Sequence, residues 1–276
     1  MITHLPTSPI GIFDSGVGGL SVWREIRRQL PYEDTRYVAD QTHIPYGPRR
    51  VAEIRTFARG ITKFLVGQQC KVIVVACNTA SGAALHALRA QFPDIPFVGM
   101  EPAVKPAAEH TKTGMIGVIA TPTTFQGDLF RDLVSRFGTR VKIHEQTCPG
   151  LVELVESGKA DSPTAERTTR RCVEPLLEKD IDQLVLGCTH YPFLYDTIRR
   201  IVGPDITIID PSPAIARQVK RVLASNEALN PRIELGNHIC YTSSYDNTLR
   251  TFMETSIAHP LPDIQRITWQ SDGLHQ

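Results

Sequence analysis

The chain has 276 residues, of which 41% are apolar and 21% charged, and its net charge is +1. A chain of this length has room for two domains and can bury roughly three quarters of its unfolded surface without needing disulfides or metals. The near balance of 30 basic and 29 acidic residues argues against nucleic acid as a partner. No apolar run reaches the roughly 18 residues of a membrane span, and the start MITHLPTSPIG lacks the pattern of a secretory signal. We therefore expect a cytoplasmic protein with no membrane partner.

The predicted elements alternate between short runs rich in β-branched residues and longer amphipathic stretches. Strands are expected at 10–13, 35–38, 72–76, 97–100, 115–119, 141–145, 183–186, 206–209 and 239–242, and helices at 17–30, 50–67, 80–91, 125–137, 164–179 and 212–225. Buried strands of about five residues that alternate with helices are typical of parallel sheets. The pattern predicts an α/β fold with mainly parallel sheets.

An internal similarity divides these elements into two halves. The segment IGIFDS at 10–15 is similar to IGVIAT at 116–121, and VVACNT at 74–79 is similar to LVLGCTH at 184–190. Two matches at nearly equal separations suggest two related α/β domains, although chance similarity between strands is an alternative. Proline-bearing segments at 102–106 and 211–213 are the expected boundaries. They give a first domain of residues 1–101 plus 212–276 and a second domain of residues 102–211.

Polar clusters follow four of the predicted strands, beginning at Asp14, Cys77, Thr121 and Cys188. In open α/β sheets, ligands bind beyond the carboxyl ends of the strands. If the two halves face each other, these clusters meet in a cleft between the domains. The sequence therefore predicts an active site in that cleft.

Six cysteines are present, at positions 70, 77, 148, 172, 188 and 240, and none forms a CxxC pair or has the spacing of a zinc site. Because cytoplasmic thiols are kept reduced, we expect no disulfide framework and no bound metal. Each cysteine is then either a buried structural residue or a reactive thiol.

Cys77 and Cys188 stand in matched contexts, each after a predicted strand and before amide or hydroxyl side chains. A single cysteine of this kind would be read as a small buried apolar residue, whereas a matched pair favours reactive thiols. A racemase must take a proton from one face of Cα and return one to the other, which two acid/base groups can do. An ordinary thiol pKa of about 8.5 brings both protonation states within reach near neutral pH. The pair therefore indicates proton transfer by two thiols.

Removal of the Cα proton leaves a carbanion, and its negative charge must be stabilised by hydrogen-bond donors. The glycine-bearing turn at 14–19 and the pairs Asn78-Thr79 and Thr189-His190 can supply them at helix N-termini. Asp14 and His190 are candidates to hold or tune a thiol proton, and each could equally be structural. Thr121 is a candidate ligand contact from the second half. The helix spacing of Glu156 by itself favours a solvated position. Trp23 and Trp269 are expected to be packing residues.

These segments resemble the glutamate racemase family. The similar motifs are FDSGVGGL (13–20), PYG (45–47), ACNTAS (76–81), PAVKPA (102–107), LVE (154–156) and GCTHYP (187–192), in the family's order and across nearly all of residues 10–225. The two cysteine motifs together are the most specific part of this resemblance.

The resemblance implies a cofactor-independent enzyme that interconverts L- and D-glutamate and supplies D-glutamate for peptidoglycan, as a homodimer of two α/β domains. It implies catalytic roles for Cys77, Cys188, Asp14 and His190. The substrate-binding residues that it implies are Asp14, Ser15, Tyr46, Gly47, Asn78, Thr79, Glu156, Thr189 and His190. Asp40 also matches a residue thought to assist in this family.

Some loop residues depart from the family pattern, among them Gln-Thr-His-Ile at 41–44 and the residues Gly150 and Glu153. These departures leave the loop contacts open. Because only nine residues precede Ile10, we expect no requirement for a cell-wall precursor as an activator.

Three alternatives stay open. An aspartate racemase or a related two-cysteine isomerase differs by one methylene of substrate, which needs only a modest change of pocket. A ligand-binding protein on the same fold would carry inert cysteines. A thiol-redox protein would normally carry the CxxC pair that is absent here.

Overall fold

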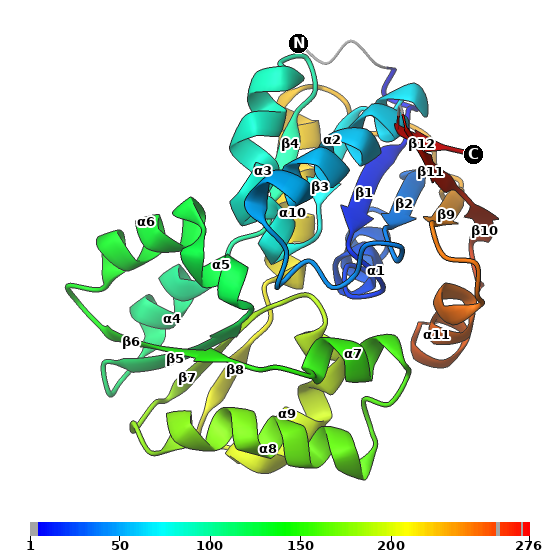
Figure 1. Cartoon of the computed structure of the whole chain (residues 1–276). Helices are drawn as coiled ribbons and strands as arrows, with labels where there is room; N and C mark the ends of the chain where they lie inside the picture. The colour runs from blue at the N-terminus through cyan, green and yellow to red at the C-terminus, as the bar shows by residue number, and fades with distance from the viewer. Residues whose placement is uncertain (1–4, 258–259, 272) are drawn as a thin grey trace.

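The computed structural model describes residues 5–257, 260–271 and 273–276, and its strands form two parallel sheets and a small hairpin (Figure 1). The larger sheet has the order β10 (Asp263–Arg266), β9 (His238–Thr242), β2 (Thr35–Ala39), β1 (Ile10–Asp14), β3 (Val72–Val75) and β4 (Phe97–Gly99). The smaller sheet has the order β6 (Lys142–Thr147), β5 (Met115–Ala120), β7 (Gln183–Gly187) and β8 (Thr207–Ile209). The antiparallel hairpin consists of β11 (Thr268–Gln270) and β12 (Gly273–His275).

The two sheets share one topology. The order β2-β1-β3-β4 in the larger sheet corresponds, strand for strand, to β6-β5-β7-β8 in the smaller sheet. Strands β1 and β5 are therefore equivalent, as are β3 and β7, which precede the two cysteine motifs. This correspondence confirms two related α/β halves with mainly parallel sheets.

Helices cover both faces of each sheet. The first sheet lies between α1 (Leu20–Gln29) with α10 (Ser212–Ser225) and α2 (Val51–Gly67) with α3 (Asn78–Gln91). The second lies between α4 (Val104–His110) with α6 (Asp128–Phe137) and α8 (Pro163–Leu177) with α9 (Tyr195–Val202). The remaining helical segments are α5 (Pro122–Gln126), α7 (Leu151–Glu156), the 3-10 turn η1 (Tyr191–Leu194) and α11 (Thr248–Ser256).

The apolar strands explain this layering. In β3, Val72 and Val74 face the core beneath α1 and α10, whereas Ile73 and Val75 face the core beneath α2 and α3. All four side chains are buried, since successive strand residues point to opposite faces and both faces are covered. The continuous apolar runs in the sequence arise from this double burial.

Several boundaries differ from the predictions. The expected helix 125–137 is two helices, because Gly127 adopts an extended conformation with φ −71° and ψ 147°. The helix expected from residue 17 begins at Leu20, because the preceding residues form the turn after β1. Helices α4, α9 and α11 and strands β10–β12 were not predicted, since their apolar patterns are short.

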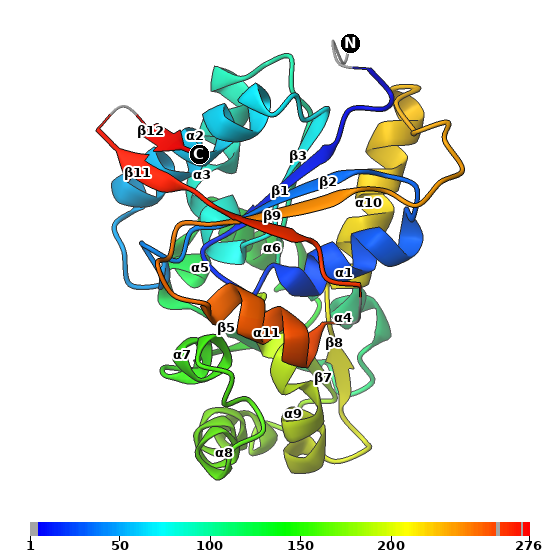
Figure 2. The ribbon, with the colours of Figure 1, turned by 90° about the vertical axis from the view of Figure 1, so that its right-hand side faces the viewer.

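The C-terminal quarter of the chain returns to the first sheet. Helix α10 packs on α1, and β9 pairs with β2 in parallel while β10 pairs with β9. Figure 2 shows β9 alongside β2. The predicted strand 239–242 is thus part of the first sheet.

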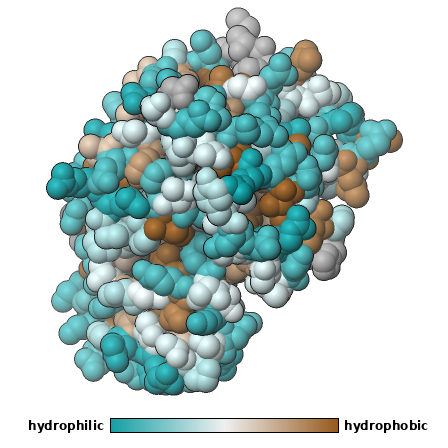
Figure 3. Space-filling model, turned by 45° about the vertical axis from the view of Figure 1, so that its right-hand side comes forward, coloured by the Kyte–Doolittle hydropathy of each residue, from teal (hydrophilic) through white to brown (hydrophobic). Residues whose placement is uncertain are grey.

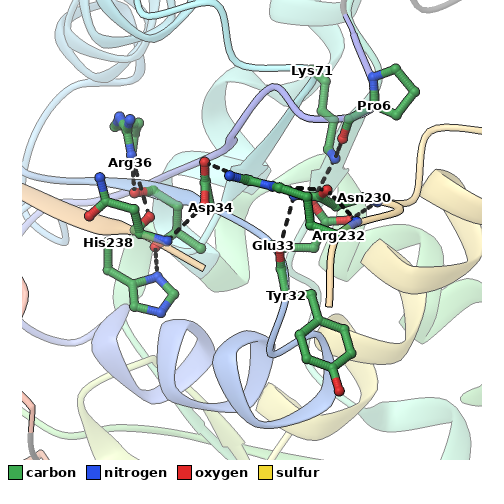
Figure 4. Close-up of polar contacts among 11 residues, drawn as sticks. Pro6, Tyr32, Glu33, Asp34, Arg36, Lys71, Asn230, Arg232 and His238 are labelled. Carbon is green, nitrogen blue, oxygen red and sulfur yellow. Dashed lines mark hydrogen bonds and ion pairs between the residues drawn. The ribbon is translucent and has the colours of Figure 1, made fainter. Parts of the chain in front are cut away.

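A buried ion pair fixes part of this returning segment (Figure 4). The Lys71 ammonium lies 2.6 Å from the Glu33 carboxylate, and both side chains are buried. The other Glu33 oxygen accepts a 2.8 Å hydrogen bond from the backbone N–H of Asn230, and Arg232 contacts Asp34 at 2.8 Å. Burial lowers the pKa of Lys71, and the partner Glu33 opposes that shift. These contacts attach residues 230–232 to the end of the first sheet opposite the cleft.

The structure corrects the expectation of free thiols at two positions. Cys148 and Cys172 are joined by a disulfide, with their Cα atoms 5.3 Å apart. Cys148 follows β6 and Cys172 lies on α8, which packs against β6, so the fold brings together residues that are 24 apart in the sequence. Their sequence spacing gave no sign of the pairing, because it depends on how the helix crosses the strand.

The outer surface is largely hydrophilic on the face shown in Figure 3, with apolar residues in separate patches. Within the described part of the chain, no helix is long and apolar enough to cross a membrane.

Candidate active site

A pocket of about 240 Å³ lies between the two sheets, at the carboxyl ends of their strands. This is below the range of about 300–1,000 Å³ that is usual for drug-sized ligands, so it suits a small molecule. Both Cys77 and Cys188 line the pocket. The other predicted residues that line it are Ser15, Tyr46, Gly47, Asn78, Thr79, Thr121, Thr189 and His190.

Cys77 is the N-cap residue of α3, and its sulfur accepts a 3.4 Å hydrogen bond from the backbone N–H of Ala80. Burial raises the pKa of this thiol well above its usual value, and the charge of nearby Asp14 adds to the shift. The N–H groups of Ala80 and Ser15 act in the opposite direction, because they stabilise the thiolate. Cys77 therefore holds a proton at neutral pH in the absence of a ligand.

Cys188 faces a different partner. It follows β7, and its sulfur lies 3.7 Å from Nδ1 of His190. The Nε2 atom of the same ring lies 2.6 Å from a carboxylate oxygen of Glu156. Burial opposes the charged imidazolium, but the contacts with Cys188 and Glu156 outweigh it and raise the pKa of His190 well above its usual value. A protonated His190 can balance the charge of a thiolate at Cys188.

Asp14 lies behind the pocket wall, at the end of β1. One carboxylate oxygen accepts a 2.8 Å hydrogen bond from the N–H of Gly16, and the other accepts a 3.0 Å bond from the hydroxyl of Thr189. Burial raises the pKa of Asp14 to about 6, while His190 and the Gly16 N–H oppose the increase. Asp14 thus connects the turn after β1 in the first domain with the turn after β7 in the second.

Glu156 also lies behind the wall, on α7. In addition to His190, it accepts a 2.7 Å hydrogen bond from the backbone N–H of Val17. Gln41 donates to its second oxygen at 3.4 Å. The sequence spacing of Glu156 favoured a solvated position, and that interpretation was wrong, because α7 turns this side chain toward the cleft. Asp14 and Glu156 therefore contact residues of the wall and are not themselves among the residues that line the pocket.

Asn78 has the features of a ligand-binding side chain. It is 3% exposed and lines the pocket, and neither its amide nitrogen nor its amide oxygen has a hydrogen-bond partner among the described residues. A buried amide without partners costs about 1–3 kcal/mol, so a polar ligand that pairs with it would gain that energy.

Three threonine hydroxyls join the two domains at the pocket edge. Oγ1 of Thr79 lies 2.9 Å from Oγ1 of Thr121 and 3.3 Å from Oγ1 of Thr124, which are themselves 2.9 Å apart. Nearby, the hydroxyl of Thr123 donates to the carbonyl of Gly47 at 2.5 Å. The strand ends of both domains therefore meet, as the internal similarity predicted.

Tyr46 and Gly47 enter the pocket from the loop after β2. The peptide bond between Ile44 and Pro45 is cis, and the phenol of Tyr46 donates a 2.6 Å hydrogen bond to Asp40. Tyr46 therefore lines the pocket while its hydroxyl is bonded to Asp40 behind the wall.

Sequence reasoning missed part of the wall. The missed residues are Pro45, Pro48, Ala120, Pro122, Thr147, Cys148, Pro149, Gly150, Val152, Glu153 and Tyr191. A signal existed for Thr147 and Cys148, since they follow a predicted strand in the manner of the other polar clusters. Helix α7 carries Val152 and Glu153 into the wall, and no local pattern indicated that.

The polar groups of the wall suit an anionic ligand, with the imidazolium of His190 as the cationic group among them. Among the residues that line the pocket there is no lysine or arginine. The N-terminus of α3 and the hydroxyls of Ser15 and Thr79 offer donors instead. No cluster of three or more metal-ligating side chains occurs in the described ranges.

Comparison with known proteins agrees with this geometry. The model of the Asp/Glu/Hydantoin racemase family matches residues 10–219. A glutamate racemase from Roseiflexus sp. is 51% identical over 215 residues, which cover 78% of this chain and 79% of the relative. One from Pseudomonas putida is 45% identical over 259 residues, which cover 94% of this chain and 97% of the relative.

Solved structures give the same result. A glutamate racemase isoform from Bacillus anthracis superposes with a TM-score of 0.86 at 35% identity, covering 96% of this chain and 98% of that one. The enzyme from Francisella tularensis in complex with D-glutamate superposes with a TM-score of 0.84 at 28% identity, over the same shares. A family match over most of the chain, relatives near 50% identity and a shared two-sheet fold lead to one conclusion: the chain belongs to the Asp/Glu/Hydantoin racemase family.

Proposed function

We propose that this chain is an amino-acid racemase that interconverts L- and D-glutamate with Cys77 and Cys188 as its two acid/base groups. The observation that carries the proposal is that two thiols from equivalent strand ends of two related domains line one small pocket. The relatives that match most of the chain are named glutamate racemases, which supports glutamate as the substrate.

The reaction follows from the two thiol environments. One sulfur, as thiolate, removes the Cα proton while the other, as thiol, donates a proton to the opposite face. Burial and Asp14 keep the proton on Cys77, whereas Cys188 lies beside the imidazolium of His190. In this proposal Cys77 starts as the acid, and each turnover exchanges the roles of the two thiols.

The remaining predicted residues hold the substrate or set the charges. Ser15, Asn78 and Thr79 donate to the substrate carboxylates, where negative charge grows as the Cα proton leaves, and Thr189, whose hydroxyl is bonded to Asp14, lies beside them. Tyr46, Gly47 and Thr121 form the edge where the domains meet. Asp14 and Glu156 act through Thr189 and His190.

The fold divides, in this proposal, into residues 1–101 plus 212–276 and residues 102–211, with the pocket between them. Two linkers would then connect the two domains. The enzyme would act in the cytoplasm as a homodimer, without cofactor, and its product D-glutamate would supply peptidoglycan synthesis. Mass measurement of the native protein in solution tests the dimer.

The experiment that tests the activity uses the purified protein without added cofactor. The circular dichroism of L-glutamate and of L-aspartate is followed in separate incubations, and the products are resolved by chiral chromatography. Decay to zero with glutamate, and not with aspartate, is the expected result. Decay of the signal with aspartate alone would identify aspartate as the substrate. No decay with any amino acid would contradict racemase activity.

A further inference from the structure

Asp40 links the C-terminal hairpin to the loop that carries Tyr46 and Gly47. This carboxylate is fully buried and lies behind the pocket wall. Its Oδ2 accepts the hydrogen bond from the phenol of Tyr46, at 2.6 Å. Its Oδ1 accepts bonds from the indole N–H of Trp269 at 2.7 Å and from the hydroxyl of Ser243 at 3.1 Å.

The indole of Trp269 sits in a fitted position on α2. A Cβ atom added to Gly60 would come within 2.6 Å of the ring of Trp269, so only glycine leaves room for the indole. On its other side the ring packs edge-on against His43, at 5.1 Å between centroids, and His43 stacks on Phe57 at 3.8 Å. Figures 1 and 2 both show β11 and β12 beside α2.

Because Asp40 is a buried carboxylate, its hydrogen bond with Trp269 stabilises the site in addition to the packing of the indole ring. A buried carboxylate is costly unless donors surround it, and hydrogen bonds to a charged group are stronger than those between neutral groups. The donors here come from the loop itself (Tyr46 and His43), from the residue after β9 (Ser243) and from β11 (Trp269). Segments more than 200 residues apart in the chain therefore converge on one carboxylate.

From this arrangement we propose that Trp269 is a positioning residue for the active-site loop, which it holds in its binding conformation through Asp40 and Tyr46. The inference rests on the proposed function, because it assigns the loop 45–48 to substrate binding. If Trp269 has this role, the C-terminal hairpin contributes to substrate affinity, and a residue that only packs against α2 would not do so.

The variant Trp269→Phe removes the N–H donor and keeps an aromatic ring in the slot. The loop is then less well held both before and during catalysis, which weakens binding of the ground state and the transition state alike. We expect KM to rise about tenfold with kcat nearly unchanged, the effect of losing one hydrogen bond to a charged group.

The matched control is Trp23→Phe. Trp23 is the only other tryptophan, and its N–H donates to Thr35 at 2.9 Å inside the first domain, with no contact to Asp40. The Trp23→Phe variant should leave KM unchanged. Gly60→Ala, which displaces the indole without altering it chemically, should raise KM as Trp269→Phe does. The thermal unfolding midpoint of each variant shows whether it is folded.

A double-mutant cycle with Asp40→Ala, which removes the acceptor, tests the route of the effect. If Trp269 acts through Asp40, the double variant has the same KM as Asp40→Ala alone. Kinetics are measured on the amino acid that the wild-type enzyme racemises. A wild-type KM in folded Trp269→Phe, a loss confined to kcat, or additive effects in the double variant would overturn the inference. A wild-type enzyme that turns over no amino acid would instead remove the proposed function, and with it the inference that depends on it.

Discussion

The two pocket cysteines differ in what surrounds them. Cys77 caps a helix and its pKa is raised by the charge of nearby Asp14, whereas the sulfur of Cys188 lies beside His190, which is itself held by Glu156. The reaction requires one protonated and one ionised thiol at the start of each turnover. The two thiols therefore have unequal surroundings within a symmetric framework.

Replacement of either thiol should stop racemisation in both directions. Serine is a far weaker acid than cysteine, so Cys77→Ser and Cys188→Ser should each lower kcat by at least about a thousandfold, within the range for general acid–base groups. The control is Cys240→Ala, which removes a buried thiol outside the pocket. Polarimetry from each pure enantiomer gives the rates. Near-normal racemisation by either serine variant would exclude the two-thiol assignment.

The charge of Asp14 should be measurable at Cys77. Since that charge is one cause of the raised pKa of Cys77, Asp14→Asn should lower this pKa and increase the thiolate fraction at any pH below it. Alkylation of Cys77 by iodoacetamide at pH 7.5, followed by peptide mass spectrometry, should become about tenfold faster for each unit by which the pKa falls. Asp182→Asn, far from the pocket at the start of β7, serves as the control, and an unchanged or slower rate in Asp14→Asn would contradict the electrostatic account.

At the level of elements, the turn after β1 fits closely against α7. A Cβ atom on Gly16 would lie 2.1 Å from a carboxylate oxygen of Glu156 and 2.4 Å from Ile44. Because Gly16 has no side chain, the turn after β1 can approach both α7 and the loop after β2 closely.

Gly16→Ala should therefore disturb catalysis more than stability. Overpacking costs typically about 1–3 kcal/mol, and here the group that is displaced is Glu156, which holds His190. We expect kcat/KM to fall at least about tenfold with a small loss in unfolding temperature. Gly67→Ala on α2, where an added Cβ meets nothing within 4 Å, is the matched control and should keep full activity. Equal values of kcat/KM for Gly16→Ala and Gly67→Ala would show that the turn after β1 has room for a side chain.

Sequence patterns located the elements that carry the chemistry, because those elements are regular. Strands β1, β3, β5 and β7 are continuous apolar runs, and the polar residues at their ends reach the pocket or its wall as expected. The network around Asp40 and the Cys148–Cys172 pair were out of reach, since they join segments whose local patterns carry no information about each other. Tertiary contacts of this kind depend on how helices and strands pack together. The periodicity of residues along a single sequence gives no signal for them.

Across the whole molecule, the C-terminal segment is attached at both ends of the first sheet. Ser243 and Trp269 contact Asp40 near the cleft, and Asn230 and Arg232 contact the Glu33–Asp34 turn at the opposite end. The pair Lys71–Glu33 lies under that second attachment, with both side chains buried.

Lys71→Met should therefore destabilise the protein strongly. It leaves the carboxylate of Glu33 buried without its cation, a change that typically costs about 3–5 kcal/mol. Chemical denaturation followed by circular dichroism measures the loss. Arg28→Met, which breaks an exposed ion pair with Glu25, is the control and should change stability far less. A similar small effect in both variants would mean that the buried pair does not stabilise this attachment.

The central claim is that two sulfur atoms, one from each domain, act on opposite faces of one carbon. Racemisation of unlabelled L-glutamate in D2O tests it at the earliest turnovers, with both enantiomers separated and analysed by mass spectrometry. The account predicts D-glutamate that carries deuterium at Cα from the start, while the L-glutamate that remains is unlabelled, because the proton removed and the deuteron delivered belong to different thiols. D-glutamate that keeps the original Cα proton, or early deuterium in the remaining L-glutamate, would contradict it.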